Sequence, residues 1–376
     1  MSPFARAALI FLGLLIGGAP AQAQEPLKVK PLYCGRGLFD VRRLEDAAKN
    51  VSGIDCIAGE KSTFACVAVA DKEIGITEFS LKRDQDGDLT CLSGAPLAPE
   101  RFGCLPGNLD GDREFEGVSL APDNLIAVTS LAINRGKAKK SKWSLFRDSP
   151  GKCEAMGRGA LAAFIKNTGS AELEWAIDRT QQCGGLIVEG LERMDGELYF
   201  GLRSPGQRAE GIAYIIHAPE NAFFSDKPMP AGTAKLDKVK FAGADGKPVA
   251  GIGIRGMDAV NGKLILLTGD AGVKGTELAL TRSRDKEMGC PDLMKGDEFP
   301  NAESGLAPML WMWTPGAEEA QLIGALGGKF ASAAVEGVTV IPGKADGKVD
   351  IILAIDDPSK AGLDTQLALI KGIVLP

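Results

Sequence analysis

The feature that most constrains this chain is a short phrase that occurs five times at long intervals. In each copy a glycine follows a polar or charged residue, precedes an apolar one, and opens a strand-like run. The copies are Ser52-Gly53-Ile54, Glu116-Gly117-Val118, Glu189-Gly190-Leu191, Arg255-Gly256-Met257 and Glu336-Gly337-Val338. The glycines lie 64, 73, 66 and 81 residues apart. A repeat of this length built from short strands predicts an all-β fold, a β-propeller with five visible blades, or six if one copy is misread.

Turn signals support this division. Asp195-Gly196 and Asn261-Gly262 lie between apolar runs in the third and fourth copies. Such pairs predict tight hairpins, because both central residues must adopt positive φ. The last copy ends after its third strand, so residues 27–33 are predicted to supply the missing outer strand and close the ring.

The first 23 residues have the pattern of a secretory signal peptide. Arg6 precedes an apolar stretch too short to span a bilayer, and Ala21-Gln22-Ala23 predicts cleavage after Ala23. We therefore expect a periplasmic or secreted protein without a later membrane span. Residues 24–376 are expected to form one propeller domain, with a helical insertion near residues 159–180 and a polar one near 281–305.

Charge and cysteine content narrow the partners and the chemistry. A formal net charge of −6 without long basic blocks argues against nucleic acid as a partner.

Eight cysteines in an exported chain predict disulfides. Spacing suggests the local pairs Cys56–Cys66, Cys91–Cys104 and Cys153–Cys183, which leaves Cys34 for Cys290. The only histidine, His217, lies in an outer strand pattern, where we expect a structural role.

The repeat also predicts where a site lies. The first strand of a blade lines the channel and the second returns beside it, so the start of the first and the end of the second reach the same channel mouth. The starts carry Glu116, Glu189, Arg255 and Glu336. The ends carry Ser130, Arg203, Asp270, Asp356 and Asp357.

The charges at this mouth favour two kinds of ligand. Glu189 can pair with Arg203 within one blade, and Arg255 with Asp270 within the next. The carboxylates without an obvious cationic partner are Glu116, Glu336, Asp356 and Asp357. Clustered carboxylates favour calcium, and they raise one another's pKa, as in a general acid or base. The predicted metal ligands are Glu116, Glu189, Glu336, Asp356, Asp357 and Asp270. Arg203 and Arg255 are predicted to bind a phosphate or carboxylate group. The alternative is that these residues only cap backbone groups.

Several longer phrases resemble a known family. They are Glu189-Gly190-Leu191, Gly201-Leu202-Arg203-Ser204-Pro205, Ile254-Arg255-Gly256-Met257, and Glu336-Gly337-Val338 with Asp356-Asp357-Pro358. The family consists of secreted bacterial β-propellers classed as a domain of unknown function and related to esterase-like phytase propellers. The resemblance covers residues 30–374. It implies calcium-assisted phosphoester hydrolysis, with Glu116, Glu189, Glu336 and Asp356 near the metal, and Arg203 and Arg255 near phosphate.

The sequence thus predicts an exported, soluble β-propeller that binds a small anionic or metal-bound ligand at one channel mouth. In the enzymatic interpretation it is a calcium-dependent phosphoesterase or esterase. The alternative is a non-catalytic periplasmic module that binds a protein or a glycan. The sequence leaves open whether the ligand is turned over.

Overall fold

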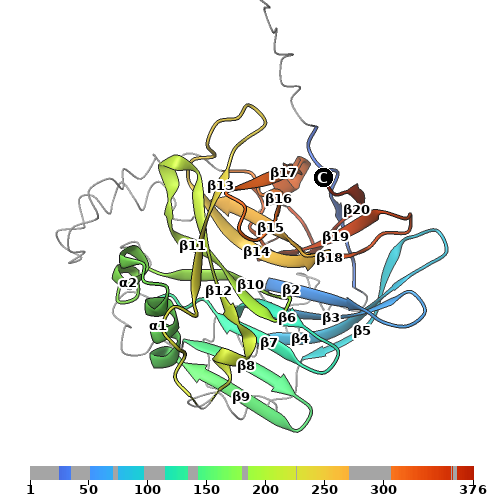
Figure 1. The fold of residues 1–376 in the computed structure, drawn as a ribbon. Coiled ribbons are helices and arrows are strands. Elements are labelled where there is room, and N and C mark those ends of the chain that lie inside the picture. Colours follow the sequence, from blue (N-terminus) through green and yellow to red (C-terminus); the bar gives the residue numbers. More distant parts are fainter. Residues whose placement is uncertain are drawn as a thin grey trace, which may run out of the picture.

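Each copy of the glycine phrase lies in the inner strand of one blade of four antiparallel strands. The third and fourth blades are joined into one eight-stranded sheet, because their outer strands pair in parallel. The computed structural model describes residues 25–34, 51–70, 75–96, 115–133, 143–179, 185–225, 227–270, 306–356, 358 and 362–376. The predicted signal peptide, Asp357 and the predicted insertion near 281–305 lie outside these residues. Within them the chain is a β-propeller of five blades (Figure 1).

The blades follow one another along the chain. Blade 1 contains β2 (Val51–Ala58), β3 (Thr63–Ala70), β4 (Ile76–Arg83) and β5 (Leu89–Pro96). Blade 2 contains β6 (Phe115–Leu120), β7 (Leu125–Thr129), β8 (Ser144–Ser149) and β9 (Lys152–Gly157). Blade 3 contains β10 (Ile187–Met194), β11 (Glu197–Gln207), β12 (Ile212–Pro219) and β13 (Lys235–Phe241). Blade 4 contains β14 (Ile252–Val260), β15 (Lys263–Asp270), β16 (Met309–Trp313) and β17 (Glu319–Ala325).

Blade 5 is built from both ends of the chain. It contains β18 (Val335–Pro342), β19 (Lys348–Ile355), β20 (Leu367–Val374) and β1 (Lys30–Pro31). β1 pairs antiparallel with β20, with Lys30 opposite Leu369, and Figure 1 shows this N-terminal segment beside β20. The predicted closure by residues 27–33 is therefore confirmed.

The repeated glycines mark the points where neighbouring inner strands come closest. A Cβ on Gly53 would lie 2.6 Å from the carbonyl oxygen of Glu116, in blade 2. A Cβ on Gly337, in blade 5, would lie 3.0 Å from the Cα of Gly53, in blade 1. Inner strand 5 therefore contacts inner strand 1 directly. This closes the ring at five blades and excludes the alternative of six.

Each inner strand also has a β-bulge directly before its glycine. In blade 1, Val51 pairs with Ala70 and Gly53 with Val69, so Ser52 is an extra residue. The same shift occurs at Glu116, Glu189, Arg255 and Glu336. Because a bulge bends the strand and re-aims its side chain, the residue before the glycine departs from the regular alternation. Repetition in five blades places one such side chain from each at the same mouth.

The predicted helical stretch near 159–180 contains α1 (Arg158–Asn167) and α2 (Ala171–Ala176). α1 buries Leu161, Phe164 and Ile165, and the Phe164 ring packs 5.2 Å from that of Phe200, in blade 3. The remaining short elements are α3 (Glu220–Phe223) and the 3-10 turns Arg208–Glu210 and Gly328–Ser332. No helix among the described residues is long and apolar enough to cross a membrane.

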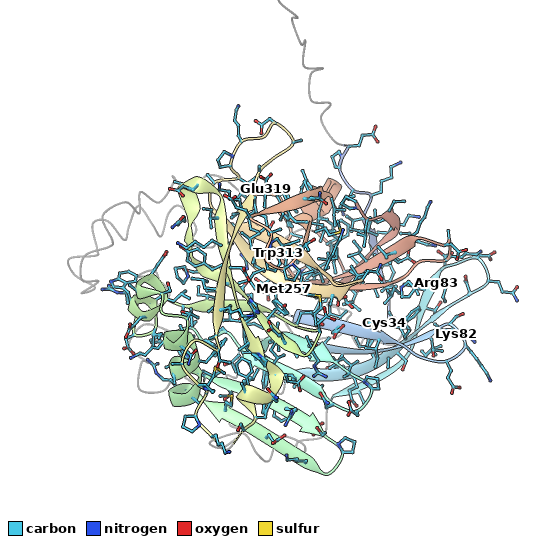
Figure 2. All side chains as sticks on the ribbon, viewed as in Figure 1. Cys34, Lys82, Arg83, Met257, Trp313 and Glu319 are labelled. Carbon is cyan, nitrogen blue, oxygen red and sulfur yellow. A yellow bond between two sulfur atoms is a disulfide. The ribbon has the colours of Figure 1, made fainter. Side chains whose placement is uncertain are left out.

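The disulfides agree with the sequence prediction in part. Cys56 pairs with Cys66 across the β2–β3 hairpin, as predicted. Cys34 pairs with Cys91, so the predicted pairs Cys91–Cys104 and Cys34–Cys290 are wrong. The reason is ring closure: Cys34 (labelled in Figure 2) follows β1, the outer strand of blade 5, and packs in the same apolar cluster as Leu89 of β5, in blade 1. Cys104, Cys183 and Cys290 lie outside the described residues, so Cys153–Cys183 stays a prediction.

His217 lies on β12, the third strand of blade 3, with 7 % of its surface exposed. Its Nδ1 contacts Glu197, its Nε2 lies 3.0 Å from Asp237, and its ring stacks on Tyr199. Burial alone would lower the pKa of His217, but the bonds to Asp237 and Glu197 outweigh it and raise the pKa. The position fits the structural role that the sequence predicts.

We expect the contribution of His217 to stability to fall as pH rises. The imidazole of His217 binds its proton more tightly in the folded protein than in the unfolded chain. The stabilisation is therefore full below about pH 6.5, the pKa in the unfolded chain, and is lost as the pH rises through the raised pKa of the folded protein. Urea unfolding of the wild type and of His217→Gln at about pH 6 and about pH 9 measures it. The difference between the two proteins should be larger at the lower pH, and a pH-independent difference would contradict the expectation. Lys235, whose Nζ lies 3.7 Å from Glu197, is present in both proteins.

Candidate functional site

Four charged side chains from three blades form a continuous chain at one channel mouth. Nη1 of Arg203, on β11 in blade 3, lies 2.5 Å from Oε1 of Glu189. Nη1 of Arg255, in blade 4, lies 3.1 Å from Oε2 of Glu189 and 2.6 Å from Oε1 of Glu336, in blade 5. The inner strands that carry Glu189, Arg255 and Glu336 surround the centre of the ring, near Met257, which is labelled in Figure 2. We call Glu189, Arg203, Arg255 and Glu336 the mouth cluster.

Arg255 holds the mouth cluster together. Besides the two carboxylates, it donates from Nε (3.2 Å) and Nη2 (2.9 Å) to the backbone oxygen of Asp270. The predicted Glu189–Arg203 pair is confirmed, and Arg255 contacts Asp270 through this carbonyl. The expectation that Glu336 has no cationic partner is wrong, because Arg255 reaches it across the boundary between two blades. Pairing residues within one blade could not reveal that contact.

Burial of the mouth cluster changes its acid–base properties. Burial raises the pKa of Glu336 to about 8, the charges of Glu189 and Asp356 add to the rise, and Arg255 opposes it. The carboxylates of Glu189 and Glu336, in turn, outweigh burial and raise the pKa of Arg255 further above its usual range. Arg255 therefore stays charged, whereas Glu336 can gain or lose a proton near neutral pH.

Arg203 differs from Arg255 in what its donors contact. Its side chain is 22 % exposed, against 11 % for Arg255. Its Nε is buried and has no hydrogen-bond partner in the described part of the chain. Arg255, in contrast, uses all three of its nitrogens on protein oxygens. Of the two arginines, Arg203 thus keeps a donor for a ligand.

The other predicted site residues lie near the same mouth. Glu116 occupies the bulge of β6 and is buried. Asp270 ends β15, and Asp356 directly follows β19, where its backbone N–H donates to Ala334. Asp357 lies outside the described residues. The structure thus brings Glu189, Arg203, Arg255 and Glu336 into contact and places Asp356 close enough to act on Glu336.

A second cluster, absent from the sequence prediction, lies further along the inner strands. Asp55, Glu192 and Asp258 each offer one oxygen, and these oxygens lie within 4.8 Å of one another, a spacing that a metal ion could bridge. Burial raises the pKa of Asp55 to about 6 and those of Glu192 and Asp258 well above their usual range. We call these three residues the channel triad.

The repeat contains a signal for the channel triad that was not used. Two residues after each glycine stands an oxygen-bearing side chain: Asp55, Ser119, Glu192, Asp258 and Thr339. This position carries a pattern as regular as that of the position before the glycine, from which the mouth residues are predicted.

Comparison with known proteins finds only distant structural similarity. No protein-family profile matches the chain, and no curated protein matches it in sequence. Among solved structures, an α-L-arabinanase of Cellvibrio cellulosa complexed with arabinohexaose is 13% identical, with 85% of this chain and 90% of that chain covered and a TM-score of 0.38. PhoX of Pseudomonas fluorescens in complex with vanadate is 10% identical over 86% and 89%, with a TM-score of 0.40. A thermostable family-43 glycoside hydrolase is 9% identical over 86% and 88%, with a TM-score of 0.42. Similarity of this degree concerns the overall arrangement of strands and carries no argument about chemistry.

Proposed function

We propose that this propeller binds a small ligand through its phosphate or carboxylate group at the channel mouth, and that Arg203 is the residue that binds this group. The buried, unpartnered Nε of Arg203 carries the proposal. A guanidinium with a free donor, already oriented by Glu189, suits an anionic oxygen, because charge-assisted bonds of this kind are the strong ones. Glu189 and Arg255 hold the group in place and do not themselves need to contact the ligand.

The same mouth supports a hydrolytic step on a phosphoester or ester. A carboxyl group with a pKa of about 8 is protonated for most of the time at neutral pH. When a water molecule attacks the phosphorus or the carbonyl carbon, Glu336 can therefore donate its proton to the oxygen that leaves as the ester bond breaks, and the proton of the water then restores the Glu336 carboxyl group. Nη1 of Arg255 lies 2.6 Å from Oε1 of Glu336 and positions the carboxyl group for this transfer. The resemblance to phytase propellers favours a phosphoester among the possible substrates.

Calcium at the mouth has no step in this proposal. Arg255 occupies the position between Glu189 and Glu336 that a bridging cation would need. A mouth cation would have to rely on Glu116, Asp270, Asp356 and Asp357. Location in the periplasm or outside the cell is part of the proposal, and the two disulfides support it.

The binding proposal is tested with inorganic phosphate and acetate as probes in isothermal titration calorimetry. We expect Arg203→Ala to weaken binding of the preferred probe about 10- to 100-fold, since a charge-assisted bond is worth about 1.5–3 kcal/mol. The affinity of Arg203→Lys for the probe should be intermediate, because lysine keeps the positive charge but lacks the paired N–H donors of the guanidinium group. Arg158→Ala is the matched control: it removes one positive charge at α1, where Arg158 pairs with Asp178. Wild-type affinity in Arg203→Ala would overturn the proposal.

Turnover is measured separately, with a panel of chromogenic phosphoesters and carboxyl esters. Glu336→Gln should lower kcat about 10²- to 10⁴-fold and leave probe binding unchanged. The wild-type rate should fall above about pH 8, as Glu336 loses its proton. Probe binding with no turnover of any ester would favour the non-catalytic interpretation.

A further inference from the structure

The channel triad is separate from the mouth cluster and differs from it in charge. Along β10, Glu192 lies three residues beyond Glu189. The mouth cluster contains two arginines, whereas the triad contains three carboxyl groups, each at least nine-tenths buried. Arg193 is the cation whose charge acts on two of them, but its Nε lies 3.1 Å from Glu220 and its Nη2 2.7 Å from Asn124. The negative charge of the triad is therefore not balanced by a direct ion pair among the described residues.

Hydrogen bonds fix the two aspartates of the triad. Asp55 accepts from the backbone N–H of Cys56 through Oδ1 and of Leu120 through Oδ2, each at 2.6 Å. Asp258 accepts from Ala259 at 2.6 Å and from Val340. Backbone N–H groups only donate, so these contacts favour the ionised carboxylates and hold them in one orientation. A preorganised pair of carboxylates of this kind suits a cation.

Glu192 provides the observation that points to a ligand. Its Oε1 lies 3.4 Å from the hydroxyl of Ser119, while its Oε2 is buried and has no hydrogen-bond partner among the residues that the structure describes. An oxygen buried without a partner is destabilising, and native proteins satisfy nearly all such atoms. The residue is only 5 % exposed, so bulk water cannot solvate it freely.

From these contacts we infer that the channel interior binds one hard divalent cation, with Asp55, Glu192 and Asp258 as its carboxylate ligands. In all five copies of the repeat, the residue two positions after the glycine has an oxygen in its side chain. In two copies this oxygen is a hydroxyl, that of Ser119 or Thr339. An all-oxygen set favours calcium or magnesium over softer metals. The cation would satisfy Oε2 of Glu192 and link blades 1, 3 and 4, so its role is to stabilise the ring. This role does not depend on the chemistry at the mouth.

The first measurement uses the wild-type mature protein. After purification without chelator, elemental analysis should find about one divalent cation per chain. After dialysis against EGTA and EDTA, adding calcium at about 100 times its dissociation constant should raise the melting temperature by about 5 °C. Magnesium and manganese are compared in the same way. Absence of bound metal together with an unchanged melting temperature for all three ions would overturn the inference, even if no variant folds.

Variants then locate the ion. Glu192→Gln and Asp258→Asn should abolish the response to calcium, whereas Glu189→Gln, the matched change three residues earlier on β10, should keep it. The sign of the effect should also reverse: without metal Glu192→Gln melts above the wild type, because one repelling charge is gone, and with calcium it melts below. A calcium response that survives Glu192→Gln but is lost in Glu189→Gln or Glu336→Gln would place the ion at the mouth and overturn this site. Loss of phosphate binding in Arg203→Ala tests the mouth proposal independently.

Discussion

Replacing Arg255 with alanine is expected to lower the free energy of unfolding by about 3–5 kcal/mol, the usual cost of removing one partner of a buried ion pair. Arg255 is the only contact between Glu189 and Glu336 within the mouth cluster, and it also binds the backbone oxygen of Asp270. Without Arg255, the buried carboxylate of Glu336 would have lost the cation that contacts it directly. Urea unfolding at about pH 8, monitored by tryptophan fluorescence, measures the change.

Two controls separate this effect from a general loss of charge. Arg203→Ala should cost about 1–2 kcal/mol, because Arg203 is more exposed and contributes one of the two ion pairs of Glu189. Adding Glu336→Gln to Arg255→Ala should restore part of the stability, since no charge then remains to be neutralised at that position. The cost of Arg255→Ala should also shrink as the pH falls from about 8 to about 6, because Glu336 becomes protonated over this range. Equal costs for the two arginine variants would show that the mouth cluster is not organised around Arg255.

Replacing Gly53 with alanine is the second change for which we expect a large loss, about 3 kcal/mol or more. The added Cβ would lie 2.6 Å from the carbonyl oxygen of Glu116 and 2.8 Å from Cγ2 of Val69. The carbonyl belongs to the inner strand of blade 2, so the strain can be relieved only if two blades move apart. Thermal melts and urea unfolding should both report the loss.

Gly159→Ala is the matched control for this substitution. Gly159 lies in α1, and a Cβ there would have no neighbour within 4 Å. Alanine is favoured over glycine in a helix by about 0.5–1 kcal/mol, so this variant should be slightly more stable than the wild type. If Gly53→Ala were as well tolerated as Gly159→Ala, close contact between inner strands would not be the reason for the repeated glycine.

Much of the architecture could be read from the sequence because its determinants are local. The pairs Asp195-Gly196 and Asn261-Gly262 all adopt positive φ, as hairpins of this kind require. The helical insertion predicted near residues 159–180 contains α1 and α2. Each of these features depends on residues a few positions apart, so its pattern is visible in a single chain. The glycine phrase adds the number of blades, because one copy opens each inner strand.

The contacts between blades were harder to predict. The pair Glu189–Arg203 within blade 3 was predicted correctly, whereas the links from Arg255 to Glu189 and to Glu336 were not predicted. The Cys34–Cys91 disulfide and the channel triad were likewise not predicted. In each case the partners lie on different blades, and their distance depends on how the ring closes.

The sequence by itself therefore determined the repeat, the hairpins, the closing N-terminal strand and the mouth at which the bulged residues gather. These follow from the period of the strands and from backbone preferences at glycine, aspartate and asparagine. Only the tertiary structure decided which charges meet, which cysteines pair, and that three carboxyl groups converge inside the channel. Closing five sheets into a ring sets those distances, because residues 66 to 284 positions apart, such as Glu189 with Arg255 and Thr339 with Asp55, become neighbours only when every blade is in place.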